Sequence, residues 1–92
     1  MYTRTKSRLF HYTAYYRTPS GRKTYVIGVK RGRIYDDYLA LDDGECENHL
    51  LLDAIRNIRV DICADPKRKV AHGVSGITVD RIEAIEPIVE VS

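Results

Sequence analysis

The sequence predicts an α+β fold in which an antiparallel β-sheet, a meander of three to five strands, packs against one α-helix near residues 45–59. Two observations predict it. Apolar and polar side chains alternate through the first forty residues, which is typical of half-buried strands, and after Glu45 the apolar residues recur at helical spacing. A chain of 92 residues, 43% hydrophobic, is long enough for one hydrophobic core, so we expect a single domain over residues 1–92.

Residues 9–17 form the first expected strand, because they are rich in aromatic side chains that favour strands. Phe10, Tyr12, Ala14 and Tyr16 share one face of it. Tyr15 lies on the other face together with Arg17, so we expect Tyr15 rather than Tyr16 to be exposed. The turn residues of 18–21 then lead into a second strand over 23–31, which predicts a hairpin.

The dipeptide Arg31-Gly32 predicts a second tight turn, since glycine tolerates the backbone angles that a reversal requires. A third strand is then expected over residues 33–41, ending in Asp42-Asp43-Gly44. These three strands make up the predicted meander.

The helix is predicted from the spacing of Leu51, Ile55, Ile58 and Ile62, with Leu52 and Ala54 on the same flank. We expect Asp43 or Gly44 to cap its first turn. Acidic residues begin the expected helix and basic ones end it, the order that the helix dipole favours; they are Glu45 and Glu47, then Arg56 and Arg59.

The last third of the chain predicts less regular structure. Residues 60–64 alternate and are expected to form a short strand that ends at Asp65-Pro66, and residues 67–76 an exposed loop. One or two short strands are expected over 77–91, where Pro87 prevents a continuous helix or central strand.

Charge is segregated along the chain although the net charge is only +2. Residues 1–33 hold nine basic residues and no acid, whereas the remaining residues hold six basic residues and all thirteen acids. All eight aromatic residues lie within the first 38 positions. The basic residues are therefore interleaved with aromatic ones.

Several function classes find no support in the sequence. The two cysteines, Cys46 and Cys63, and the three scattered histidines do not have the spacing of a disulfide framework or a zinc site. No phosphate-binding glycine loop or nucleophile motif occurs. The longest apolar run, Leu50 to Leu52, is far too short for a membrane span, and no signal peptide is expected. We expect a cytoplasmic protein that is not an enzyme and uses no metal or cofactor.

Six acids lie within residues 36–47: Asp36, Asp37, Asp42, Asp43, Glu45 and Glu47. Their spacing does not match a calcium-binding loop. Three interpretations stay open: a solvated turn and helix start, an acidic binding face, or an internal charge partner of the basic hairpin.

The basic and aromatic first third predicts a binding surface. Arginine and lysine neutralise phosphates, and tyrosine rings stack on unpaired bases. The alternative is that the tyrosines are core aromatics and the basic residues an ordinary solvated face. We expect a protein or ribonucleoprotein partner, with possible RNA or DNA phosphate contacts. The candidate binding residues are Arg4, Lys6, Arg8, Tyr15, Arg17, Arg22, Lys23, Lys30, Arg31 and Arg33.

Two resemblances add to this interpretation. The segments Asp53-Ala54-Ile55-Arg56-Asn57-Ile58 and Asp80-Arg81-Ile82-Glu83-Ala84-Ile85 resemble the D-x-I-x-x-I ending of the Sm-like barrel of WYL domains. Only Asp37-Tyr38-Leu39 stands where that family has Trp-Tyr-Leu, so no ligand-sensing residue carries over. This resemblance implies a nucleic-acid-binding or regulatory interaction module.

In length and charge pattern the chain is similar to the small phage-encoded anti-CRISPR proteins that inhibit type I surveillance complexes. That family has no shared motif, and no residue is transferred from it. The resemblance implies stoichiometric binding to an RNA-guided complex in the host cell, which would block the path of target DNA.

Overall fold

The computed structural model describes residues 4–35 and 42–91, and the backbone alone of residue 91. In chain order its elements are the strands β1 (Thr5–Arg17) and β2 (Lys23–Tyr35), the helix α1 (Asp43–Ala64), a 3₁₀ turn η2 (Gly73–Gly76), and the strands β3 (Thr78–Ala84) and β4 (Val89–Val91). The antiparallel sheet and the single long helix confirm the predicted α+β fold.

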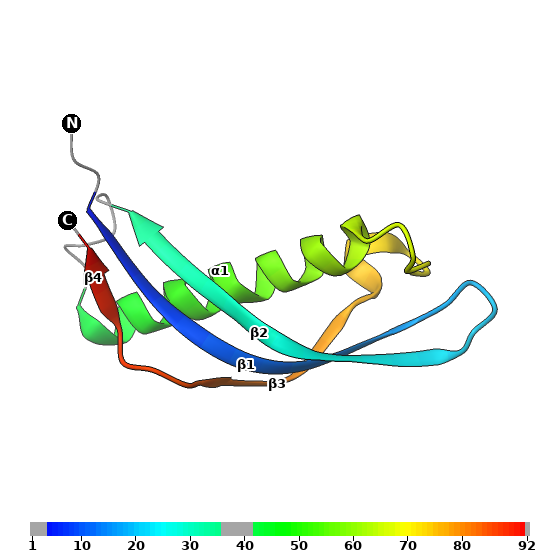
Figure 1. Ribbon diagram of the computed structural model, residues 1–92, viewed down its shortest axis with the longest axis horizontal. Helices are drawn as coiled ribbons and strands as arrows, with labels where there is room; N and C mark the ends of the chain where they lie inside the picture. The colour runs from blue at the N-terminus through cyan, green and yellow to red at the C-terminus, as the bar shows by residue number, and fades with distance from the viewer. Residues whose placement is uncertain (1–3, 36–41, 92) are drawn as a thin grey trace.

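β1 is the central strand of the sheet. It pairs antiparallel with β2 along its whole length, from Thr5 opposite Tyr35 to Arg17 opposite Lys23. On its other side it pairs first with β4 and then with β3, which follow one line along the same edge (Figure 1). The β1–β3 register shifts between Thr13 and Ala14, where β3 has one extra residue. The sheet order is therefore β2-β1-β3, with β2 as an edge strand, so the sheet is antiparallel as predicted but is not a meander, in which β2 would lie in the middle.

Two predictions about the strands were wrong. β2 continues straight through Gly32 to Tyr35, so Arg31-Gly32 is not a turn, and residues 33–35 belong to the second strand instead of a third. The rest of the expected third strand, residues 36–41, lies outside the described residues. The third and fourth strands come from 77–91, as one or two strands were expected there, and Pro87 lies between them.

The helix is longer than predicted. Its N-cap is Asp42 and not Asp43 or Gly44 as expected, because the Asp42 Oδ1 accepts a hydrogen bond of 2.8 Å from the Glu45 backbone N–H. The helix then runs through residues 60–64, where a strand was expected. Arg56 and Arg59 consequently lie before the last turn, which contains no basic residue.

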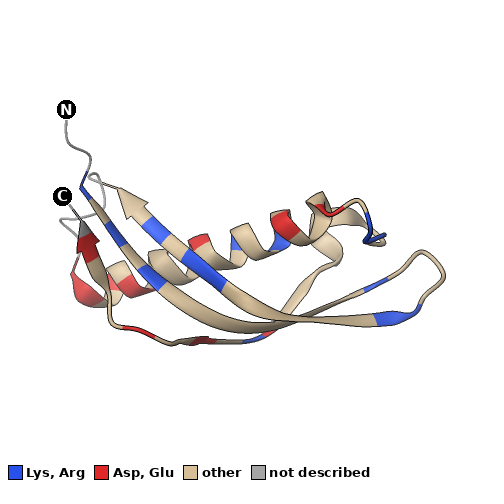
Figure 2. Ribbon diagram, in the orientation of Figure 1, with Lys and Arg blue, Asp and Glu red and all other residues tan. Residues whose placement is uncertain are grey.

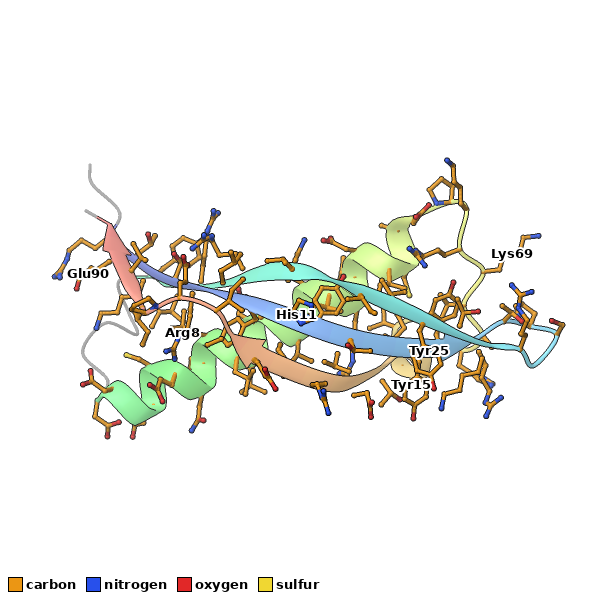
Figure 3. The ribbon with its side chains drawn as sticks, turned by 60° about the horizontal axis from the view of Figure 1, so that its bottom comes forward. Arg8, His11, Tyr15, Tyr25, Lys69 and Glu90 are labelled. Carbon is orange, nitrogen blue, oxygen red and sulfur yellow. The ribbon has the colours of Figure 1, made fainter. Side chains whose placement is uncertain are left out.

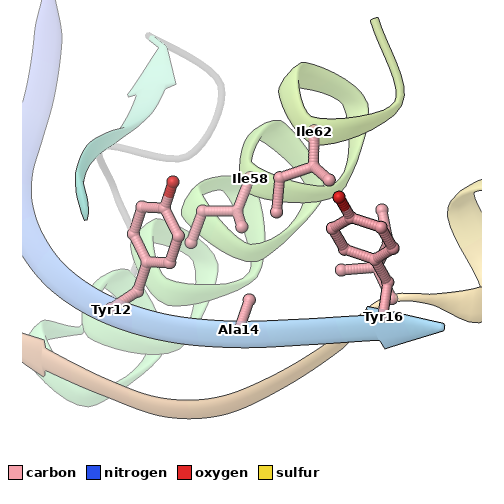
Figure 4. Packing of buried hydrophobic residues seen from close by; sticks show 6 residues of the cluster. Tyr12, Ala14, Tyr16, Ile58 and Ile62 are labelled. Atoms are coloured by element: carbon pink, nitrogen blue, oxygen red, sulfur yellow. The ribbon is translucent and has the colours of Figure 1, made fainter. Parts of the chain in front are cut away.

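α1 covers one face of the sheet, which we call the covered face. Cys46, Leu50, Ala54, Ile58 and Ile62 are its buried residues, spaced by four. The predicted stripe was partly wrong, since Leu51 and Ile55 are only half-buried and Leu52 is exposed. The buried stripe packs on the even-numbered side chains of β1, as Figure 4 shows for Tyr12, Ala14, Tyr16, Ile58 and Ile62.

The sheet and helix approach each other closely at Gly32. A Cβ added to this glycine would overlap the Leu50 carbonyl oxygen and lie 2.9 Å from the Leu50 carbonyl carbon. Only a residue without a side chain allows this approach. The Arg33 backbone N–H beside it donates a 2.8 Å hydrogen bond to the Asp53 carboxylate of the helix. This part of the β2 edge is therefore closed by α1.

The second face of the sheet, the open face, carries the odd-numbered side chains of β1 and β2. The described residues place no helix over it. Tyr25, Ile27 and Val29 of β2 are 56%, 69% and 49% exposed there. On β1, Tyr16 is buried and Tyr15 is only half-buried, which confirms that Tyr15 is the more accessible of the two.

Candidate nucleic-acid interface

The candidate residues are distributed over the two ends of an elongated molecule whose extents are 47 × 26 × 17 Å (Figure 2). One end, which we call the terminal end, holds the start of β1, the end of β2, the first turns of α1, and β4. The other, the hairpin end, holds the β1–β2 turn and the loop after α1. In Figure 3, Arg8 and Glu90 lie toward the first end, whereas Tyr15, Tyr25 and Lys69 lie toward the second.

At the terminal end three of the candidate basic residues are paired with acids. The Arg8 guanidinium lies 3.5 Å from the Glu47 carboxylate of α1, and the Arg31 guanidinium lies 2.7 Å from that of Glu86. Arg4 pairs with Glu90 of β4. These acids come from the helix and from the last strands, so the fold neutralises these basic side chains internally.

Three further candidates differ from these. Lys30, at the middle of β2, pairs with Asp61 of α1. Lys6 and Arg33 lie toward the terminal end, and no ion pair is seen for either among the described residues. Of the acidic segment predicted as a possible charge partner, Glu47 pairs with Arg8 and Asp42 caps the helix, while Asp36 and Asp37 lie outside the described residues.

At the hairpin end the basic side chains have no such matching acids. Arg17, Arg22 and Lys23 are exposed, and within residues 4–35 and 42–91 none of them forms an ion pair. The Arg17 Nη1 donates a 3.0 Å hydrogen bond to the Gly21 carbonyl, which holds the turn. An arginine bonded to a neutral carbonyl keeps its charge, so this end is the more positive one.

The loop after α1 adds two basic residues that the sequence interpretation missed. Lys67 and Lys69 are exposed beside the hairpin, and the loop is held there by a 2.8 Å hydrogen bond from the Ala71 N–H to the Arg17 carbonyl. The neighbouring Arg68 pairs with Asp65 instead. The run Lys67-Arg68-Lys69 is visible in the sequence. Its position beside the hairpin depends on the length of α1, which the sequence interpretation underestimated.

Two tyrosines and a lysine cluster on the open face of the hairpin end. The rings of Tyr15 and Tyr25, opposite each other on β1 and β2, have centroids 5.9 Å apart and an interplanar angle of 52°. The Lys23 Nζ lies 4.1 Å from the Tyr15 ring centroid and 5.2 Å from that of Tyr25. A cation over aromatic rings is weakly held at an exposed site, worth about 0.5–1 kcal/mol. Lys23 can therefore leave the rings at little cost.

β3 carries one basic residue, Arg81, and two acids, Asp80 and Glu83, and all three are exposed. The net charge of β3 is therefore negative, and the positive field of the hairpin end comes from the turn and from the loop after α1.

The structure supplies neither a metal centre nor a spanning helix in the part of the chain that it describes. Among residues 4–35 and 42–91 no three His, Cys, Asp or Glu side chains lie close enough together to hold a metal ion. Cys46 is buried and Cys63 is half-buried, and no disulfide joins them. No helix in the described segments is both long and apolar enough to cross a membrane.

The chain was compared with protein-family models, curated proteins and solved structures. No protein-family model, curated protein or solved structure matches this chain.

Proposed function

We propose that this is a non-enzymatic binding protein whose hairpin end contacts the backbone of single-stranded nucleic acid, free or within a ribonucleoprotein complex. One observation carries the proposal. Four of the six other predicted basic residues are paired with acids, whereas among the described residues those of the hairpin end are not, and one of the latter, Lys23, lies over the rings of Tyr15 and Tyr25.

The electrostatic part of the argument concerns Arg17, Arg22 and Lys23. A basic group already paired with a carboxylate has to give up that pair before it can bind a phosphate. The cations of the hairpin end have no such cost, and phosphate binding there would release counterions from the nucleic acid. The same reasoning removes Arg4, Arg8, Lys30 and Arg31 from the candidate surface.

The tyrosines supply the second part. Every base offers a flat face, so stacking on an aromatic ring tolerates any sequence. Tyr25 is more than half exposed, and Lys23 covers part of both rings. On binding, Lys23 moves from the rings to a phosphate and a base takes its place.

The finer form of the proposal is that the partner is an RNA-guided surveillance complex and that the protein blocks its target DNA. It is supported by the likeness in size and charge pattern to small phage inhibitors. The exposed apolar residues Ile27 and Val29 adjoin the tyrosines on the open face and would add protein contacts.

Direct binding is tested by fluorescence anisotropy with labelled single-stranded oligonucleotides at several salt concentrations. We expect the Arg22→Glu/Lys23→Glu variant to weaken binding at least about tenfold, and the salt slope to fall by about one for each phosphate that the variant no longer neutralises. Arg22→Glu alone is compared with Arg56→Glu, which makes the same charge change on an exposed helix position and should bind as the native protein does. Equal binding by native protein and the double variant, or a flat salt profile, contradicts the proposal.

The partner is tested by affinity capture of the tagged protein from a host lysate, with and without nuclease. Recovery of an RNA-guided complex that survives nuclease supports the inhibitor form. Nuclease-sensitive recovery, or recovery of nucleic acid alone, supports binding to nucleic acid in general and contradicts inhibition of an RNA-guided complex.

A further inference from the structure

A hollow of about 470 Å³ lies at the hairpin end on the covered face of the sheet, beyond the last turn of α1. The β1–β2 turn forms one side of it and the loop after the helix forms the other. The hydrogen bond between Ala71 and Arg17 keeps these two sides together. Its polar lining residues are Thr18, Ser20, Arg22, Thr24, Lys67 and Lys69.

The lining of this hollow, over the residues that the structure describes, has three cations and no carboxylate. A second hollow of about 520 Å³, between β2 and α1, provides a comparison within the same molecule. It also has three cations, Lys30, Arg31 and Arg33, but Asp53 and Asp61 line it as well, and Lys30 is paired with Asp61. Of the two hollows, the one at the hairpin end therefore has the more positive lining, because no carboxylate balances its three cations. It is the one that favours a bound anion.

Hydroxyl groups complete the hairpin-end hollow. The hydroxyls of Thr18 and Ser20 lie 2.9 Å apart, and the Thr18 Oγ1 accepts a 3.2 Å hydrogen bond from the Arg22 backbone N–H. Thr24 Oγ1 is buried and has no hydrogen-bond partner among the described residues. This atom is covered by protein, so the hydroxyls that the hollow itself offers are those of Thr18 and Ser20. Phosphoryl oxygens accept hydrogen bonds from cationic groups and from hydroxyls, and the hollow offers both.

The position of the hollow relates it to the tyrosine pair. Thr24 and Tyr25 are consecutive residues of the edge strand β2, so their side chains point to opposite faces. Thr24 lines the hollow, whereas Tyr25 lies on the open face beside Tyr15. A nucleic-acid chain with a base stacked on the tyrosines therefore has to pass only around the β2 edge for its end to reach the hollow.

We infer that this hollow binds the terminal phosphate monoester of a nucleic-acid strand whose neighbouring bases stack on Tyr15 and Tyr25. A monoester carries nearly two negative charges at neutral pH, whereas a backbone diester carries one, so three converging cations favour the end of a strand over its interior. The inference rests on the proposed function, because it names which part of a nucleic acid this end of the molecule selects.

The test uses single-stranded oligothymidylates of about ten nucleotides with a 5′-phosphate, a 3′-phosphate or two hydroxyl ends, each labelled away from the end compared. We expect one of the phosphorylated forms to bind about tenfold more tightly than the hydroxyl form, the size expected for hydrogen bonds to a charged group. In Lys67→Ala/Lys69→Ala this gain should disappear while binding of the hydroxyl form persists. Arg56→Ala, a cation removed elsewhere, should keep the full gain.

Lys67 and Lys69 are exposed, so their removal should leave the thermal unfolding midpoint unchanged, which separates a loss of binding from a loss of folding. Equal binding of all three oligonucleotides by native protein would overturn the inference and leave the proposed function standing. So would a phosphate gain that survives in Lys67→Ala/Lys69→Ala. If no oligonucleotide binds, the proposed function itself fails and this inference with it.

Discussion

The two ends of the β1–β2 hairpin are built from the same two strands and are both rich in basic residues, yet they differ in what surrounds those residues. At the terminal end, Arg4, Arg8 and Arg31 meet acids from α1, the β3–β4 connection and β4. At the hairpin end, Arg22 shares a hollow with two further lysines, Lys67 and Lys69, and Lys23 lies over two tyrosine rings. The difference shows that charge along a sequence does not determine the field of a surface, which depends on the acids that the fold brings back.

The direction of α1 explains much of this difference. Its acidic first turn, with Asp43 and Glu45, lies at the terminal end, and its last turn points toward the hairpin end (Figure 1). Asp65 and Pro66 separate the end of the helix from the first basic residue of the loop, Lys67, so the helix contains no cation in its last turn but delivers the basic loop to the hairpin end.

The largest effect is expected from breaking the helix–sheet contact at the terminal end with Gly32→Ala. The new Cβ would meet the Leu50 backbone, which moves only if the whole helix moves. Overpacking against backbone should cost about 3 kcal/mol or more in the free energy of unfolding, measured by urea denaturation.

Gly44→Ala is the matched control. Its Cβ would lie 3.5 Å from the Asp42 carboxylate, so stability should stay the same or rise. Equal stability of the two variants would contradict the close approach.

A second, smaller effect distinguishes the covered face from the open face. Ile58 is fully buried in the cluster under the hairpin, and Ile58→Ala should lower the free energy of unfolding by about 3 kcal/mol. Ile27, 69% exposed on the open face, should lose less than about 1 kcal/mol on the same change. Thermal unfolding of both variants measures the difference. A large loss for Ile27→Ala would mean that something covers the open face in solution, and light scattering would then detect self-association.

The smallest effect tests the comparison of the two ends most directly. Arg31→Gln removes the ion pair with Glu86 and a 3.1 Å hydrogen bond to the buried Ser7 hydroxyl. It should cost about 1 kcal/mol, since the pair is partly exposed. Arg22→Gln should change stability by less than about 0.5 kcal/mol but weaken oligonucleotide binding, which Arg31→Gln should not. The opposite pattern would place the binding surface at the terminal end.

The features that local pattern controls were predictable from the sequence. The alternation of Phe10, Tyr12, Ala14 and Tyr16 identified the buried face of β1, and the turn residues of 18–21 identified the hairpin. The change of period after Glu45 identified the helix. Each of these signals lies within a few residues of what it predicts.

The errors arose where tertiary contacts override local preference. Gly32 suggested a turn, but the fold uses it because the Leu50 backbone approaches there. Residues 60–64 alternate like a strand, yet Ile62 continues the helical stripe Leu50, Ala54 and Ile58 and is buried in the core. The ion pairs of Arg4 and Arg31 were not predictable for the same reason, since their partners Glu90 and Glu86 are distant from them in sequence.

The pairing of β1 also affects how this chain folds. β1 is made early, yet Phe10 pairs with Ala84 and Ser7 with Val89, near the other end of the described chain. Loops of this length are closed slowly, because their entropy is lost before the contacts form. During synthesis the β1–β2 hairpin would therefore emerge with its apolar covered face unpaired, and it would wait for α1 and then for β3. The last strands to pair would be β3 and β4, and they pair with β1, the first strand made. Refolding should therefore be slow for a chain of this size.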